Sequence, residues 1–407
     1  MVHLAGSAHP GPHRGGLAVR PEGLRGAELR MARALTGNAG ASVSAAAPAM
    51  ARHPDAAIAV TRMPHVGVLD GIRAVAFGLV FLGHAGLGAV LIPGGFGVTL
   101  FFFLSGFLIT SLLRVERWRS GRVDLKRFYL RRFLRIQPPL WITMAVVFAL
   151  TAGGLTATPY DPLGVIAQAT LWINYAHLFG IADGLPDLPL WSLAVEEHFY
   201  LIFPAIFLLS LRQPVQVVAA WCAVACAAAL ALRLIYVFGF GEVYYTYYWS
   251  HTRVDSILFG CILALWQNPV LERHAWRPRP AHVAAALFFL LMTFAYRNEA
   301  FRETIRYTIQ GLCLFVLFSA VMQTGGPVRA ILTSWPLQRI GLYSYTLYLI
   351  HMVALALFEF NMPWLGRVGW GVAAALASLA YAAVLYAWVE RPLARIRHRM
   401  NESEARS

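Results

Sequence analysis

The stretch VLDGIRAVAFGLVFLGHAG, residues 68–86, decides the fold of this chain. It is long and apolar enough to cross a membrane as a helix, yet it carries three ionisable side chains, Asp70, Arg73 and His84. Such side chains are costly in a bilayer and normally face the interior of a helix bundle or an aqueous cavity. The stretch therefore predicts a membrane helix with a polar stripe turned toward its neighbours.

Helical geometry places these three side chains on one face. Arg73 and His84 are 11 residues apart, which is three turns plus about 20° and about 16 Å along the helix axis. Asp70 precedes Arg73 by one turn and can pair with it. An ion pair marking the cytoplasmic end of the helix explains Asp70 and Arg73 as well as a functional role does. For His84, which lies deep in the predicted span, we favour function.

The rest of the chain repeats this apolar pattern. Hydrophobic residues make up 58% of the 407 residues and charged residues only 13%, which is the composition of an all-α polytopic membrane protein. A shorter apolar segment, residues 164–180, is interrupted by Asn174 and His177, and we expect it to be interfacial or re-entrant. We expect about ten transmembrane helices in one bundle, near residues 68–92, 95–113, 139–157, 191–211, 215–238, 253–267, 281–296, 305–323, 339–360 and 368–390.

The basic residues indicate topology. The net charge is +14, and nine Lys or Arg residues fall in the segment after the second predicted span. This distribution favours topology signals and contacts with membrane lipids over nucleic-acid binding. Ten spans place both termini in the cytoplasm of a multi-pass plasma-membrane protein. We expect residues 1–65 to be a disordered basic extension, residues 66–392 to be the membrane domain and residues 393–407 to be a basic cytoplasmic tail.

A second concentration of polar residues begins a later span, WSLAVEEHFYLIFP. Its adjacent residues Glu196 and Glu197 point about 100° apart on a helix. One of them can face a cavity while the other lies at the interface or pairs with an arginine. The sequence does not distinguish which.

Two further spans carry polar or small side chains. In GLYSYTLYLIH, Ser344, Tyr348 and His351 follow the spacing i, i+4, i+7 and form one stripe. A structural role and a functional role are equally good explanations for His351. In GGFGVTLFFFLSGFLIT, Ser105 and Gly106 stand among phenylalanines, a pattern typical of close helix packing.

These residue types suit two different functions. A histidine can take a proton from a hydroxyl, and arginines at a cytoplasmic mouth, as in RRFLRIQPP, can hold the phosphates of an anionic donor. Together they would support acyl transfer from acyl-CoA. Buried Arg, His and Glu residues are equally expected in a proton-coupled transporter or flippase. The four cysteines show no metal-ligand spacing, so we expect no metal.

A series of motifs decides between these functions. In order they are LDGIRAVA with Arg73 and His84 spaced R-x10-H, FFFLSGFLI, RRFLRIQP, WSLAVEEHFYLIFP, TRVDSILFG, YSYTLYLIH and ERPLARI. From about residue 66 to residue 392, the chain resembles the acyltransferase-3 family of membrane O-acyltransferases. Each motif is weak alone, but the ordered series is specific.

The resemblance implies a ten-helix enzyme that moves an acyl group, usually acetyl, from cytoplasmic acyl-CoA to a hydroxyl, often of a sugar. His84 would be the catalytic histidine, as base or as acyl carrier, with Arg73 its required companion. Further roles follow the motif positions: Arg132, Arg135 and Ser105 at the donor, Glu196 or Glu197 supporting the site, and Asp70, Asp255, Tyr348 and His351 as weaker matches.

The motifs do not identify the acceptor. Many relatives carry an SGNH hydrolase-like domain after the bundle, whereas this chain resembles the stand-alone form. The resemblance therefore implies a hydroxyl-bearing acceptor such as a sugar, a lipid-linked glycan or a macrolide-like metabolite.

Overall fold

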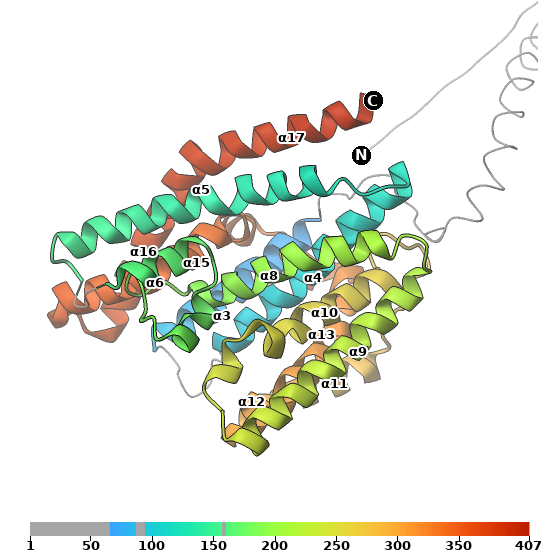
Figure 1. Cartoon of the computed structure of the whole chain (residues 1–407), viewed down its shortest axis with the longest axis horizontal. Helices are drawn as coiled ribbons and strands as arrows, with labels where there is room; N and C mark the ends of the chain where they lie inside the picture. The colour runs from blue at the N-terminus through green and yellow to red at the C-terminus, as the bar shows by residue number, and fades with distance from the viewer. Residues whose placement is uncertain (1–65, 87–93, 157–159, 407) are drawn as a thin grey trace, which may run out of the picture. The chain divides into compact units, whose positions relative to one another are not determined.

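The computed structural model describes residues 66–86, 94–156 and 160–406. The predicted N-terminal extension and the end of the first predicted span lie outside the described residues. The described part is built from helices and contains no strand (Figure 1). The longer helices are α3 (Gly67–His84), α4 (Gly94–Ser120), α5 (Leu125–Ala152), α8 (Leu190–Leu209), α9 (Val215–Leu234), α10 (Ser250–Trp266), α11 (Pro280–Ala295), α13 (Ile305–Gln323), α15 (Trp335–Asn361), α16 (Gly366–Leu385) and α17 (Arg391–Arg406).

Short helices connect these elements. They are α6 (Pro162–Ala169), α7 (Ile173–Ala176), η1 (His177–Phe179), η2 (Ile235–Gly239), η3 (Tyr245–Tyr247), α12 (Glu299–Glu303), α14 (Gly326–Leu332), η4 (Pro363–Leu365) and η5 (Tyr386–Glu390). The segment expected to be interfacial folds into α6, α7 and η1, each too short to cross a bilayer.

The described helices agree with an all-α multi-pass membrane protein. Eight of them are long and apolar enough to cross a membrane. The other two predicted spans are helical but shorter, because α10 has 17 residues and α11 has 16. The prediction of ten spans with both termini in the cytoplasm therefore stays a prediction.

The second and third spans differ from the sequence prediction. The segment expected to be a basic loop is mostly helix, because α4 continues to Ser120 and α5 begins at Leu125. The third predicted span, residues 139–157, is shifted relative to α5, which begins 14 residues earlier, ends at Ala152 and contains both Pro138 and Pro139. Membrane helices tolerate proline where the surrounding structure stabilises the backbone, and Tyr345 of α15 donates a hydrogen bond to the carbonyl oxygen of Ile136 in this turn at 2.7 Å.

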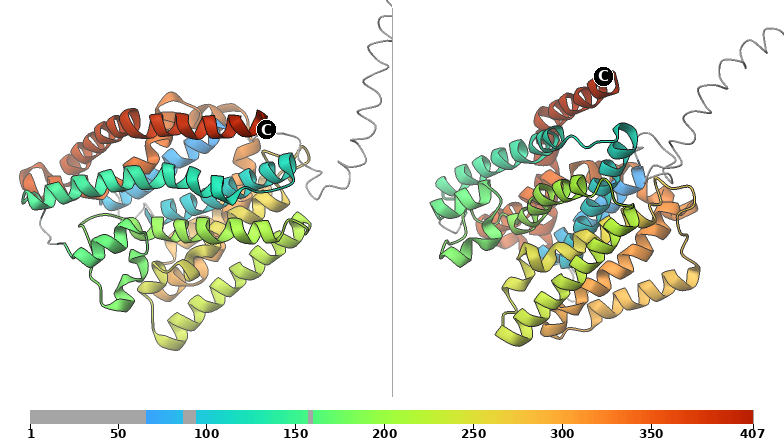
Figure 2. Two further views of the ribbon diagram at one scale, coloured as in Figure 1. Left: turned by 45° about the horizontal axis from the view of Figure 1, so that its top comes forward. Right: turned by 45° about the vertical axis from the view of Figure 1, so that its right-hand side comes forward.

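Helix α4 is central in the packing. It contacts α3, α8, α10 and α13, and Figures 1 and 2 show it enclosed by these helices. Small residues allow its closest approach: a Cβ atom on Gly106 would lie 1.9 Å from the carbonyl oxygen of Ile257, and one on Gly260 would lie 2.0 Å from that of Phe103. The predicted close packing at Gly106 is therefore confirmed.

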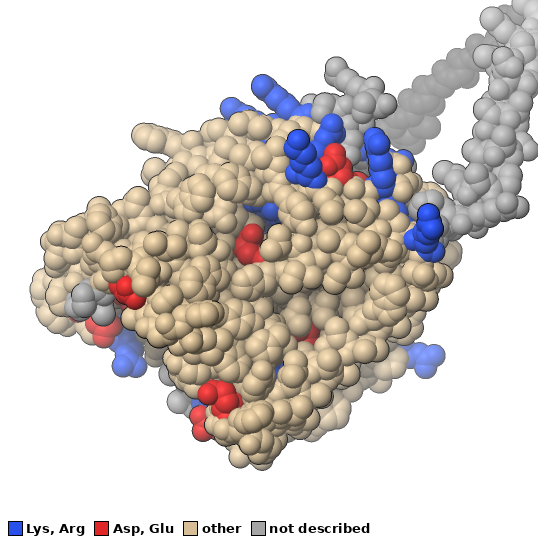
Figure 3. Space-filling view, in the orientation of Figure 1, with Lys and Arg blue, Asp and Glu red and all other residues tan. Residues whose placement is uncertain are grey.

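The charged side chains are distributed unevenly. In the face shown in Figure 3, most Lys and Arg side chains lie along the edge formed by α17 and the start of α5. The same face is hollowed between α5 and α8, where charged side chains are visible inside. This edge corresponds to the basic segments that the sequence places in the cytoplasm.

Candidate active site

Helix α3, which carries the predicted polar stripe, packs against both α15 and α4. Arg73 donates a hydrogen bond to Asp70, as their helical spacing predicts. Both side chains are largely buried, with 19% and 16% of their surface exposed. The pair leaves part of the guanidinium of Arg73 available to the cavity that it lines.

A cavity of about 170 Å³ lies where α3, α4, α5, α8 and α15 meet. Its polar wall carries three arginines, Arg73, Arg132 and Arg135, and its remaining wall is mostly apolar. Arg132 stacks on Tyr200, with the guanidinium carbon 5.2 Å from the ring centroid. Concentrated guanidinium groups beside an apolar wall suit a ligand with an anionic part and a hydrocarbon part.

Helix α8 contributes a carboxylate to this cavity. Glu196 lines it and accepts hydrogen bonds from Ser105 at 2.8 Å and from Tyr200 at 3.1 Å. Glu197 does not line it, and its buried Oε1 atom has no hydrogen-bond partner among the described residues. The tertiary structure thus separates two glutamates that the sequence could not rank.

Helix α15 brings Tyr348 into the cavity wall and His351 behind it. The hydroxyl groups of Tyr348 and Ser192 lie 2.5 Å apart, and the ring of Phe101 packs edge-on against Tyr348 with centroids 6.0 Å apart. These three side chains all line the cavity. Of the three, Tyr348 also packs against the fully buried ring of His351, with centroids 5.5 Å apart.

The two predicted histidines meet, although 267 residues separate them in the sequence. Nδ1 of His84 lies 3.1 Å from Nε2 of His351, and their ring centroids are 5.2 Å apart. His84 is the last residue of α3 and is exposed at its edge, and neither ring lines the arginine cavity. The pair is a candidate site for proton transfer beside the cavity.

Asp255 lies away from both groups. It forms a fully buried ion pair with Arg233 of α9 at 2.7 Å, and it does not line the cavity. Sequence reasoning missed Arg233, although an arginine inside the otherwise apolar run of α9 was an available signal. Removing one partner of such a pair leaves an uncompensated buried charge, so the geometry of Asp255 indicates a stabilising role.

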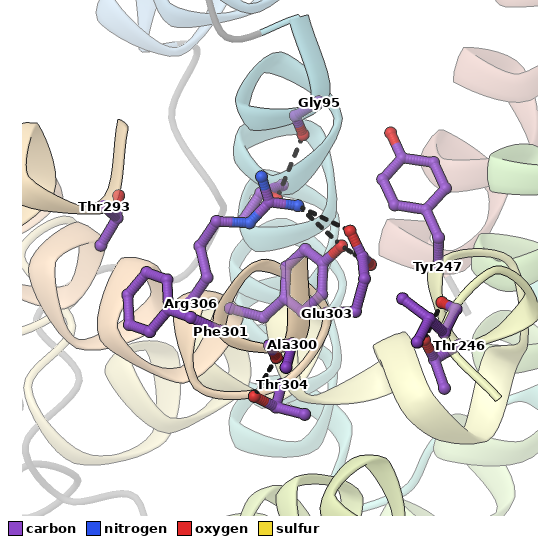
Figure 4. Close-up of polar contacts among 12 residues, drawn as sticks. Gly95, Thr246, Tyr247, Thr293, Ala300, Phe301, Glu303, Thr304 and Arg306 are labelled. Carbon is purple, nitrogen blue, oxygen red and sulfur yellow. Dashed lines mark hydrogen bonds and ion pairs between the residues drawn. The ribbon is translucent and has the colours of Figure 1, made fainter. Parts of the chain in front are cut away.

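A further polar cluster, also missed from the sequence, ties α12 to α13. Figure 4 shows the side chain of Arg306 reaching toward Glu303, with a shortest distance of 3.5 Å. Tyr307 donates to Glu303 at 2.7 Å and accepts from Arg306 at 2.9 Å. The ring of Tyr307 also lies 3.9 Å from the guanidinium carbon of the fully buried Arg253. These contacts join α10, α12 and α13.

The described residues contain no group of three or more His, Cys, Asp or Glu side chains arranged to hold a metal ion. The four cysteines are buried, free thiols.

Comparison with known proteins identifies relatives. O-acetyltransferase OatA of Staphylococcus aureus (strain NCTC 8325) is 32% identical over 304 residues, covering 70% of this chain and 49% of the relative. Peptidoglycan O-acetyltransferase OatA of Listeria monocytogenes is 28% identical over 354 residues, covering 81% of this chain and 56% of the relative. The chain spans about half the length of these curated relatives. No solved structure matches.

The family comparison covers most of the chain. The model of the acyltransferase-3 family, described as an acyltransferase domain, matches residues 66–388. This range includes the arginine cavity and the histidine pair. The protein is therefore a member of the acyltransferase-3 family, as its ordered motifs predicted.

Proposed function

We propose that this protein is a membrane O-acetyltransferase that moves an acetyl group from cytoplasmic acetyl-CoA to a hydroxyl of a carbohydrate. Its family and its O-acetyltransferase relatives support the reaction class. The acetyl-CoA donor and the catalytic role of His84 are supported by the cavity lined by three arginines and by the His84–His351 pair, which lies next to Tyr348 in the cavity wall. The donor, the acceptor and the role of each residue belong to this proposal.

The cavity supports a phosphate-bearing thioester as donor. Guanidinium groups bind phosphate through paired, charge-assisted hydrogen bonds, and both Arg132 and Arg135 line the cavity. Glu196 accepts a hydrogen bond from Ser105 and another from Tyr200, the ring on which Arg132 stacks, so its carboxylate lies on the same side of the cavity as Arg132. We assign Arg73, Arg132 and Arg135 to the phosphates and place the acyl end toward Tyr348.

The proposed reaction is a single acyl transfer. The acceptor hydroxyl oxygen attacks the thioester carbonyl carbon while an imidazole nitrogen of His84 takes the hydroxyl proton. The carbon–sulfur bond then breaks, and the thiolate leaves with the proton that His84 returns. The products are the O-acetyl ester and free CoA. We place the route of the acetyl group toward His84 at the Ser192–Tyr348 contact, because Tyr348 lines the cavity and also packs against His351, the partner of His84.

The acceptor is proposed from the similarity of this chain to its relatives. The Listeria relative is a peptidoglycan O-acetyltransferase, and we propose a glycan of the cell envelope as the acceptor here. The edge rich in Lys and Arg in Figure 3 supports an orientation with that edge in the cytoplasm. In that orientation α3 runs outward and His84 lies near the outer surface of a plasma membrane. Ten spans and cytoplasmic termini complete the proposed topology.

The test uses the full chain in liposomes. Acetyl-CoA labelled in its acetyl group is supplied together with a panel of acceptors that includes peptidoglycan fragments, and both labelled ester and free thiol are measured. We expect equal amounts of the two products. His84→Ala should lower turnover by about 10² to 10⁴, the usual contribution of a general base.

A matched control separates this effect from general damage. His274, which is exposed in a loop, should tolerate replacement by alanine without loss of turnover. Full activity in His84→Ala would refute the assigned role. Substrate movement driven by a pH gradient, without release of CoA, would refute the acyltransferase proposal and support a proton-coupled transporter.

A further inference from the structure

The side chain of His351 is enclosed within the bundle. None of its surface is exposed, and the rings of Phe77 and Phe81 lie 5.8 Å and 6.4 Å from it, centroid to centroid. Its two nitrogens have different partners: Nδ1 lies 2.7 Å from the carbonyl oxygen of Tyr348, and Nε2 lies 3.1 Å from Nδ1 of His84. Both nitrogens of this buried ring are thus used.

These two contacts determine where the protons lie. A carbonyl oxygen can only accept a hydrogen bond, so Nδ1 of His351 must carry a proton. In a neutral imidazole the other nitrogen then has the lone pair and must accept. Nδ1 of His84 is therefore the donor in the contact between the rings. It follows that Nε2 of His84 holds a lone pair that His351 does not use.

The neutral form of His351 follows from its surroundings. No carboxylate of the described residues forms an ion pair with either histidine. Two phenylalanine rings pack against His351, so a charge on it would be buried in an apolar environment, which is costly. A neutral His351 that accepts from His84 is the arrangement that satisfies both contacts.

We propose that His351 is a positioning residue that holds His84 in the tautomer with its proton on Nδ1, so that Nε2 is the reactive nitrogen. This inference rests on the proposed function, because it assigns the base of that reaction. When Nε2 takes the acceptor proton, the Nδ1 hydrogen bond becomes charge-assisted and stronger. His351 thus orients the base and stabilises its imidazolium, a task that a carboxylate performs in Ser-His-Asp enzymes.

Tyr348 links this pair to the cavity. Its backbone carbonyl orients His351, while its hydroxyl group bonds to Ser192 in the cavity wall. One residue of α15 therefore contacts both the proposed donor site and the residue that positions the base. Movement of Tyr348 on donor binding would reach the histidine pair directly.

The kinetic test compares two replacements of His351. His351→Leu removes both hydrogen bonds, and we expect kcat to fall by at least about 10²-fold, since a wrongly held catalytic histidine is a poor base. The KM for acetyl-CoA should change less than about twofold, because His351 does not line the donor cavity. His351→Gln can accept from His84 and donate to the Tyr348 carbonyl, so it should recover much of the lost kcat.

The matched control is another histidine with a hydrogen bond. His198 of α8 bonds to Ser250 at 2.7 Å and contacts neither histidine of the pair. His198→Leu should leave kcat within about threefold of the native value. An equal loss of kcat in the two leucine variants would refute a specific role for His351.

A spectroscopic measurement tests the tautomer without relying on turnover. Nitrogen-15 NMR of the full chain with labelled histidine distinguishes protonated from unprotonated ring nitrogens, and the His84 signals are those lost in His84→Ala. We expect Nδ1 of His84 to be protonated and Nε2 unprotonated in the native protein, and a mixture of tautomers in His351→Leu. A protonated Nε2 in the native neutral ring would overturn the proposal.

The transfer assay and the NMR measurement distinguish failure of the proposed function from failure of the positioning inference. If native protein transfers no acetyl group but shows the expected tautomer, the proposed function is wrong and the positioning of His84 stands. If transfer occurs and His351→Leu leaves both kcat and the His84 tautomer unchanged, the positioning inference is wrong and the proposed function stands.

Discussion

The contact between α4 and α10 allows a prediction whose magnitude follows from the structure. A Cβ atom added at Gly106 would lie 1.9 Å from the carbonyl oxygen of Ile257, whereas real Cβ contacts are essentially never below 3.0 Å. The obstacle is backbone, which cannot rotate away as a side chain does. Gly106→Ala must therefore separate α4 from α10 by about 1 Å, and we expect a loss of about 1–3 kcal/mol in stability, the usual cost of overpacking.

The same shift should reduce activity. Ser105, next to Gly106, lines the cavity and donates to Glu196 at 2.8 Å. A displacement of about 1 Å would stretch this hydrogen bond beyond its useful length. We therefore expect Gly106→Ala to raise the KM for the donor as well as lower the thermal midpoint.

The assay is thermal unfolding in detergent, followed by tryptophan fluorescence, with acetyl transfer measured in parallel. Gly78 in α3 is the matched control, because an added Cβ there meets nothing within 4 Å. Gly78→Ala should gain up to about 1 kcal/mol through the better helix propensity of alanine. If Gly106→Ala unfolds at or above the native midpoint, the close packing of α4 on α10 is not as described.

Three further predictions concern single charged residues. Glu196→Ala leaves the hydroxyl groups of Ser105 and Tyr200 without their acceptor, at a cost of about 1–3 kcal/mol of stability each. Glu196→Gln keeps an acceptor and should therefore unfold at a higher temperature than Glu196→Ala; equal unfolding midpoints of the two variants would contradict this. Asp255→Ala should cost about 3–5 kcal/mol by stranding the buried charge of Arg233, as measured by denaturation, and a near-native midpoint would show that the pair contributes little. Arg135→Ala should raise the KM for acetyl-CoA about tenfold or more, because it removes a charged hydrogen-bond donor from the cavity. The control Arg122→Ala, at an exposed position, should leave this KM unchanged; equal KM values in the two variants would exclude Arg135 from the donor site.

Sequence reasoning was most successful within single helices. The spacing of Asp70 and Arg73 predicted their ion pair, and the i, i+4 spacing of Ser344 and Tyr348 predicted that they share a face, which the cavity uses. Helical periodicity is a local property, so it can be read from a few consecutive residues. The same periodicity placed Asp70, Arg73 and His84 on one face of α3, of which Arg73 lines the cavity whereas His84 is exposed at the helix end.

Boundaries were less predictable. Apolar length marks the part of a helix that crosses the membrane, but not how far the helix continues beyond it. For this reason α4 and α5 run well past the predicted spans. Arg117, expected in a basic loop, instead donates to the carbonyl oxygen of Leu211 within the bundle.

The sequence alone determined that this is a membrane protein with an ordered series of acyltransferase motifs, because composition and motif order need no knowledge of packing. Only the tertiary structure decided that Glu196 rather than Glu197 lines the cavity, that Asp255 pairs with Arg233 and that His84 meets His351. These pairings depend on how each helix is rotated and shifted against its neighbours. That register is set by contacts across the whole bundle, and no local pattern along the chain records it.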